Sequence, residues 1–278
     1  MSWMYRGFRG WRGSSELFPG VLLPVVLRRV AFLMLLLVGT VLFACSADEL
    51  GVVENTTPEL PVPESTSTPV PTRVPVVVVI LNPSLQAAVW VALDKSTSDI
   101  IDLDILGLTE FAAPGQGISD ITGLEYTTHL TTFNVWVNQL SDISIVAGLT
   151  NLTLLSLGRL QIIDISAVSG LTKLTTLLLY QNQISDISPM MGLIGLSRLY
   201  LSDNMIIDVS PVANLTNLPV LHLDDNEIDD VMPVSDLKNL EDLDLLNNQI
   251  NDIGYLTGLT NLSLLKLNGN LPLPCPPS

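Results

Sequence analysis

The 278 residues carry 12 basic and 28 acidic side chains, which gives a formal net charge of −16. So acidic a surface repels nucleic-acid phosphates, which excludes DNA and RNA as partners and favours a cationic one. With only two cysteines and two histidines, the chain has no disulfide framework, and neither histidine has a second histidine or cysteine at zinc-ligand spacing.

An export signal is predicted over residues 1–44. Arg28 and Arg29 precede the apolar run 30–43, and this basic flank and run length are typical of a secretory signal rather than a spanning helix. The run leads into Leu-Phe-Ala-Cys, ending at Cys45, which resembles a bacterial lipoprotein box. The resemblance implies cleavage before Cys45 and acylation of its sulfur, and the alternative is an uncleaved anchor helix. Both place the remaining residues outside the cytoplasm, attached to a membrane.

The predicted leader holds five of the arginines and one glutamate, so the chain beyond it has 7 basic and 27 acidic residues and a net charge of −20. Residues 45–81 are predicted to be a linker, rich in proline, threonine, serine and glutamate. About thirty such residues at ~3 Å each would reach on the order of 90 Å from a membrane. The apolar run 76–81 within this segment is either a strand or the first packed element.

A helical N-terminal cap is predicted over residues 82–110. Asn82 followed by Pro83 is typical of a helix N-cap and first helical position. A stripe of apolar residues then falls on one helical face, which could cover the exposed end of whatever follows. This stripe consists of Leu85, Ala88, Val89, Ala92 and Leu93.

Over residues 111–271 an aspartate recurs every 22 residues, and such a fixed period indicates a stack of identical supersecondary units. An asparagine keeps the same period and follows a Leu-x-Leu alternation, the pattern of a short strand with one face inward. We expect both columns to be structural, because buried backbone groups need polar partners. The aspartates are Asp120, Asp142, Asp164, Asp186, Asp208, Asp230 and Asp252; the asparagines are Asn138, Asn182, Asn204, Asn226, Asn248 and Asn270, with Leu160 in one place.

The unit, seen as NQISDISPM at 182–190, resembles the internalin-like leucine-rich repeats of bacterial surface proteins. The resemblance implies a leucine-rich-repeat solenoid, or horseshoe. Its parallel β-sheet would line the concave face, short 3₁₀ or irregular turns would form the convex face, and the helical cap would cover the N-terminal end. A protein of this family would bind a partner on its concave face.

Two features of the turns lead to local predictions. A positive φ is expected at Gly148 and its counterparts Gly170, Gly192, Asn214, Asp236 and Gly258, and the serines preceding proline, as at Ser188, are expected to be N-caps. The proline-rich tail 272–278 cannot continue the sheet. Its Cys275 is either an incidental thiol or one that pairs between molecules.

The outward side chains of the strands are free of the repeat consensus and are the predicted binding surface. Aromatic residues lie in its first half, and Asp224, Asp225, Asp242 and Asp244 form an acidic cluster in its second half. Adjacent strands are ~4.8 Å apart, so these side chains are neighbours. The candidate binding residues are Trp136, Tyr180, Arg198, Tyr200, His222, Asp224, Asp242 and Asp244.

The sequence therefore predicts a cell-surface protein that binds a protein or peptide, with a basic partner favoured. A structural scaffold of the envelope is the main alternative. Ser202, His222 and Asp244 are the only catalytic combination to consider, and no oxyanion-binding turn accompanies them, so no enzyme, cofactor or metal is expected. A calcium ion bridging Asp224, Asp242 and Asp244 is a further alternative.

Overall fold

The computed structural model describes residues 74–95 and 99–271, which belong to one compact unit, 69–278. The predicted export leader, Cys45, the linker up to residue 73 and the tail 272–278 lie outside the described residues. Within the described ranges no helix has the length and apolar character needed to cross a bilayer.

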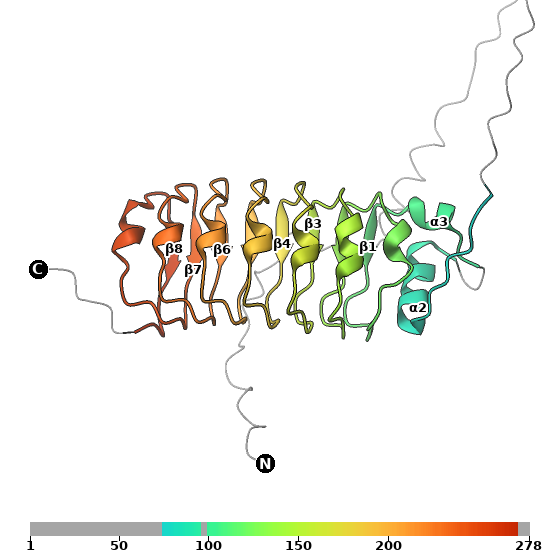
Figure 1. The fold of residues 1–278 in the computed structure, drawn as a ribbon, viewed down its shortest axis with the longest axis horizontal. Helices are drawn as coiled ribbons and strands as arrows, with labels where there is room; N and C mark the ends of the chain where they lie inside the picture. The colour runs from blue at the N-terminus through green and yellow to red at the C-terminus, as the bar shows by residue number, and fades with distance from the viewer. Residues whose placement is uncertain (1–73, 96–98, 272–278) are drawn as a thin grey trace, which may run out of the picture. The chain divides into compact units, whose positions relative to one another are not determined.

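Eight three-residue strands form one parallel sheet in chain order (Figure 1). Each strand pairs with the strand 22 residues further on, as Glu110 does with Thr132. The predicted solenoid is therefore confirmed, with one strand per repeat. The strands are β1 (Glu110–Ala112), β2 (Thr132–Asn134), β3 (Leu154–Ser156), β4 (Thr176–Leu178), β5 (Arg198–Tyr200), β6 (Val220–His222), β7 (Asp242–Asp244) and β8 (Leu264–Lys266).

The middle residue of each strand from β1 to β7 points into the coil and is buried. The next inward residue, two positions on, is buried as well, as Leu199 and Leu201 show at 0% exposure. Each such leucine contributes about 1.5–3 kcal/mol through burial of its apolar surface. Because every repeat adds the same residues at the same height, the core is one continuous column.

Short 3₁₀ helices form the side of each repeat opposite the sheet (Figure 1). The aspartate column holds their first turns, since Asp186 Oδ1 accepts a hydrogen bond from Ser188 N at 2.8 Å. Ser188 itself is the first helical residue, so the predicted serine N-cap is wrong. The helices are η1 (Leu124–Tyr126), η2 (Ser144–Gly148), η3 (Ser166–Val168), η4 (Ser188–Met190), η5 (Ser210–Val212), η6 (Met232–Val234) and η7 (Gly254–Gly258).

The left-handed residue of each repeat is not where the sequence placed it. Gly148 and its counterparts have no positive φ; instead the residue just before the asparagine column does, from Val137 at 58° to Asn247 at 54°. The chain bends there, shortly after the strand, and this bend has the positive φ. Gly148 ends a right-handed 3₁₀ turn, and a Cβ added to it would meet no atom within 4 Å.

The asparagine column has the predicted structural role. Asn204 donates from Nδ2 to the carbonyl oxygens of Leu179 and Leu201 at 3.0 and 2.9 Å. Its Oδ1 accepts from Ile184 N at 3.1 Å. One buried amide thus connects two neighbouring repeats and satisfies backbone groups that have no strand partner.

Two helices, α2 (Pro83–Ala92) and α3 (Asp102–Leu106), precede β1 in the chain (Figure 1). Asn82 caps α2 as predicted, accepting a hydrogen bond from Leu85 N at 2.9 Å. In the preceding apolar run Val78 and Ile80 are buried, and Val77 forms an isolated antiparallel bridge with Ile101. This run therefore packs with the cap, although it forms no strand of the main sheet.

Candidate functional site

The outward side chains beside the buried middle residue of each strand form a surface that we call the strand face. Parallel in-register pairing places Tyr200, His222, Asp244 and Lys266 side by side across β5 to β8. Asp224 follows His222 by two positions, so it projects from the same side of the chain. The predicted residues in the second half of this surface therefore lie close together. We call His222, Asp224, Asp242, Asp244 and Lys266 the polar cluster.

His222 is held by contacts on two sides. Its Nε2 lies 3.1 Å from Asp242 Oδ2, and its ring meets Tyr200 edge-on, with 4.8 Å between centroids and 74° between planes. The Tyr200 contact limits rotation of the imidazole, while Asp242 fixes which nitrogen is hydrogen-bonded. Nδ1 is left as the second ring nitrogen for another partner.

Asp244 is the most deeply placed acid of the polar cluster, with a side chain only 8% exposed. Its Oδ2 pairs with Lys266 Nζ at 2.7 Å, and its Oδ1 accepts from Leu246 N at 3.2 Å. The hydrogen bond to Asp244 raises the pKa of Lys266 above its ordinary value, so the ammonium stays charged at neutral pH. Three carboxylates nevertheless face this single ammonium, so the polar cluster stays negative.

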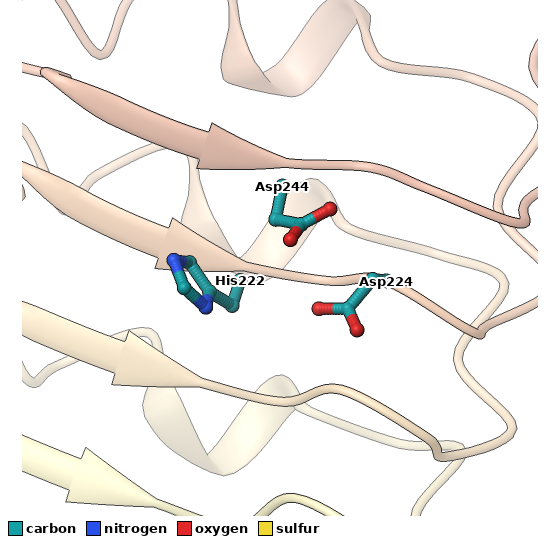
Figure 2. A group of neighbouring side chains, drawn as sticks. All are labelled: His222, Asp224 and Asp244. Carbon is teal, nitrogen blue, oxygen red and sulfur yellow. The ribbon is translucent and has the colours of Figure 1, made fainter. Parts of the chain in front are cut away.

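Asp224 accepts a hydrogen bond from Ser202 Oγ at 2.5 Å. Burial raises the pKa of the Asp224 carboxyl, and the charge of Asp244 raises it further, against the lowering effect of the Ser202 hydroxyl. Figure 2 shows Asp224 and Asp244 directing their carboxylates into the same space beside the His222 ring. One ligand atom from each of these three side chains lies within 4.8 Å of the others.

The serine–histidine pair that catalysis would need is not formed. Ser202 donates its hydroxyl to Asp224, and Nε2 of His222 pairs with Asp242. In this arrangement Ser202 and His222 are therefore not paired as a nucleophile and its base.

Other predicted residues lie apart from the polar cluster. Asp225 does not belong to the acidic cluster, because its backbone has φ 54°, its side chain is exposed, and it accepts a hydrogen bond from Asn247. Such a left-handed residue turns away from its neighbours on the strand. Arg198 is exposed at the start of β5.

The predicted aromatic residues do not form one continuous strip. Tyr180 lies over Gly158, and a Cβ added to that glycine would be 2.5 Å from the tyrosine Cζ. Burial by this packing raises the pKa of Tyr180. Trp136 is half-buried and lies two repeats from Tyr180, on the side of the cap. Across residues 99–271, the contacting ring pair within the predicted site is Tyr200 with His222.

Sequence reasoning omitted Lys266 and Ser202 from the binding residues. The signal was present, since each stands 22 residues from the acid that it contacts, Lys266 after Asp244 and Ser202 before Asp224. In a parallel stack this spacing means direct contact between neighbouring strands. A search of the sequence for oppositely charged residues 22 positions apart would have identified Lys266 as a partner of Asp244.

Similar solved structures are leucine-rich-repeat proteins. An internalin (InlF) from Listeria monocytogenes is 33% identical, with a TM-score of 0.67 over 68% of this chain and 56% of its own. An internalin C2 from the same species is 33% identical, with a TM-score of 0.65 over 68% of this chain and 84% of its own. A plant receptor (RGFR1), solved with the peptide hormone RGF2, is 22% identical, with a TM-score of 0.54 over 60% of this chain and 29% of its own. This last likeness shows the fold alone.

The chain thus spans little more than half the length of the first of these internalins. No protein-family model matches the sequence, and a search of curated proteins finds no match.

Proposed function

Since the chain belongs to the internalin-like family of leucine-rich-repeat proteins, we propose that it binds a protein or peptide through its strand face, outside the cytoplasm. The partner segment presents lysine or arginine side chains to the polar cluster. The domain order of leader, linker, cap and repeats proposed from the sequence would hold this face away from a membrane to which Cys45 is attached.

The polar cluster is the observation that carries this proposal. Asp244 is 6% exposed, and Asp242 Oδ1 is buried without a hydrogen-bond partner in the described part of the chain. Burial of such groups costs stability. The solenoid does not require them, because the positions equivalent to Asp242 in β2, β3 and β4 hold Thr132, Leu154 and Thr176. A costly feature with no structural role is typical of a functional site.

The chemistry of the surface favours a basic occupant. A lysine or arginine can pair with the carboxylates, and arginine can bind a carboxylate through two parallel hydrogen bonds. Tyr200, half-buried beside His222, offers an aromatic surface for the apolar part of the same side chain. The plant receptor of the same fold is a precedent for peptide recognition by such a solenoid, and we propose a comparable use here.

Location outside the cytoplasm is supported by the basic flank, the apolar run and the box ending at Cys45. Labelling intact cells of a bacterial expression host with a fatty-acid analogue tests this part separately. A label on the wild-type chain that Cys45→Ser abolishes supports the anchor. An unlabelled chain that remains in the cytosol contradicts it.

Selection of random displayed peptides on the purified full-length chain tests the binding function. We expect the selected peptides to be enriched in arginine and lysine, and to bind Asp242→Asn/Asp244→Asn at least roughly tenfold more weakly. The matched control is Glu227→Gln/Asp229→Asn, which removes the same charge from exposed positions outside the strand face. Peptides without basic enrichment, or equal losses in both double variants, would contradict the proposal and favour a scaffold.

A further inference from the structure

We propose that His222, Asp224 and Asp244 form a binding site for a divalent transition-metal ion of the Zn²⁺ type. The site belongs to the polar cluster but does not depend on partner binding, because the ion is bound by this chain alone. It differs from the calcium alternative raised by the sequence, which used Asp242 as a ligand. In the structure Asp242 contacts His222 and holds the ring.

The geometry supplies three convergent donors from two adjacent strands. One ring nitrogen of His222 and one oxygen each of Asp224 and Asp244 lie within 4.8 Å of one another (Figure 2). Ligands ~2.0–2.2 Å from a tetrahedral ion are about 3.4 Å apart. Small side-chain rotations that move each donor atom by about 1 Å would therefore bring the three donors to coordination distance of one ion. The fourth coordination position would remain open to water or a partner.

The surroundings resemble the outer shell of a metal site. Asp242 Oδ2 lies 3.1 Å from His222 Nε2 and accepts a hydrogen bond from it when that nitrogen carries the proton, and Ser202 donates to Asp224 at 2.5 Å. Outer groups of this kind orient a ligating imidazole and a ligating carboxylate. In addition, Asp242 Oδ1 is buried without a hydrogen-bond partner among the described residues, and the single ammonium of Lys266 offsets the charge of the three carboxylates only in part.

The donor set favours a transition metal over calcium. A histidine nitrogen with two carboxylates suits Zn²⁺ and its neighbours in the first transition row. Calcium needs six to eight oxygen ligands, whereas the atoms that converge here are one oxygen each of Asp224 and Asp244 and a ring nitrogen. The histidine is thus what separates this site from a merely acidic surface.

A metal ion at this site would compete with the Lys266 ammonium for the Asp244 carboxylate. Its ammonium pairs with Asp244 Oδ2, but its side chain is 43% exposed, so it can swing into solvent. An arriving divalent ion would displace the ammonium and take over Asp244. Removal of the lysine charge should therefore tighten metal binding. If the cluster had only a structural role, loss of the lysine would not increase the affinity for a metal.

Isothermal titration of the full-length chain with ZnCl₂, without any peptide partner, tests the site. His222→Ala should weaken Zn²⁺ binding at least tenfold, Asp242→Asn by roughly tenfold as an outer group, and Lys266→Met should tighten it. His129→Ala is the matched control, because His129 is the only other histidine and its ring contacts the Leu106 carbonyl far along the solenoid. Identical titrations for the wild type, His222→Ala and His129→Ala would overturn the proposal.

A second measurement needs no substitution at the site. Co²⁺ added to the wild-type chain should shift and broaden the His222 ring proton signals in the NMR spectrum while those of His129 stay in place. Equal effects on both histidines, or none on His222, would overturn the site even if a variant failed to fold. Because neither measurement uses a peptide, failure of the metal site leaves the peptide selection result unaffected, and the converse also holds.

Discussion

Replacement of Asn204 by leucine should destabilise the solenoid by about 2 kcal/mol. The substitution removes three hydrogen bonds of 2.9–3.1 Å, from Nδ2 to two carbonyl oxygens and from Ile184 N to Oδ1, together with a longer one from Nδ2 to Ser202 O at 3.3 Å that is not counted further. At ~1 kcal/mol each the loss is about 3 kcal/mol, of which added apolar burial recovers about 1 kcal/mol. The Leu179 and Leu201 carbonyls still accept from Asn182 and Asn226, so the group left without a partner is the buried Ile184 N–H.

Urea unfolding followed by circular dichroism measures this change. With a slope of ~2–3 kcal/mol per molar urea, the midpoint should fall by roughly 0.7–1 M. Asn251→Leu is the matched control, since Asn251 is exposed. If Asn204→Leu unfolds at the same urea concentration as the wild type, the hydrogen bonds of the asparagine column to the backbone do not stabilise the solenoid.

Three further outcomes are expected. Leu160→Asn should restore an acceptor for Leu140 N–H, which has no hydrogen bond among residues 99–271, so it should cost less than 1 kcal/mol or stabilise the chain in the same urea assay. Gly158→Ala should displace the Tyr180 ring, because the added Cβ would lie 2.5 Å from Cζ, and tyrosine fluorescence should change without loss of the far-ultraviolet spectrum. Finally, stability should fall as pH drops below ~4, the unfolded-state pKa of aspartate, because hydrogen bonds from the turns lower the folded-state pKa values; an unchanged urea midpoint between pH 5 and pH 3 would contradict this. The carboxyls concerned are Asp120, Asp142 and Asp186.

The sequence predicted the solenoid because a fixed 22-residue period leaves one way to stack identical units. The role of Asn204 followed from the same logic, since an amide that repeats inside a coil must satisfy backbone groups. The left-handed position was assigned wrongly because glycine at 148 suggested it, whereas the chain places Val137 and its counterparts there. That conformation belongs to the bend after the strand and does not follow the preference of the residue itself, since valine, arginine and glutamine all adopt it.

The candidate site was predictable in part. Neighbouring strands implied that His222 and Asp244 would be adjacent, and they are register partners. The partition of hydrogen bonds was not predictable, because the imidazole can rotate toward Asp242, Asp224 or Asp244 and small differences in side-chain angle decide among them. The exclusion of Asp225 likewise depended on a backbone angle that the sequence does not display.

The 22-residue register also bears on how such a chain can change over generations. Unequal recombination that adds or deletes one whole unit joins surfaces of the same kind, so it preserves the pairing of every remaining strand. Shorter insertions within a strand would break that pairing. The polar cluster spans the strands β6 to β8, so units can be gained or lost on its N-terminal side while the cluster is inherited as a block.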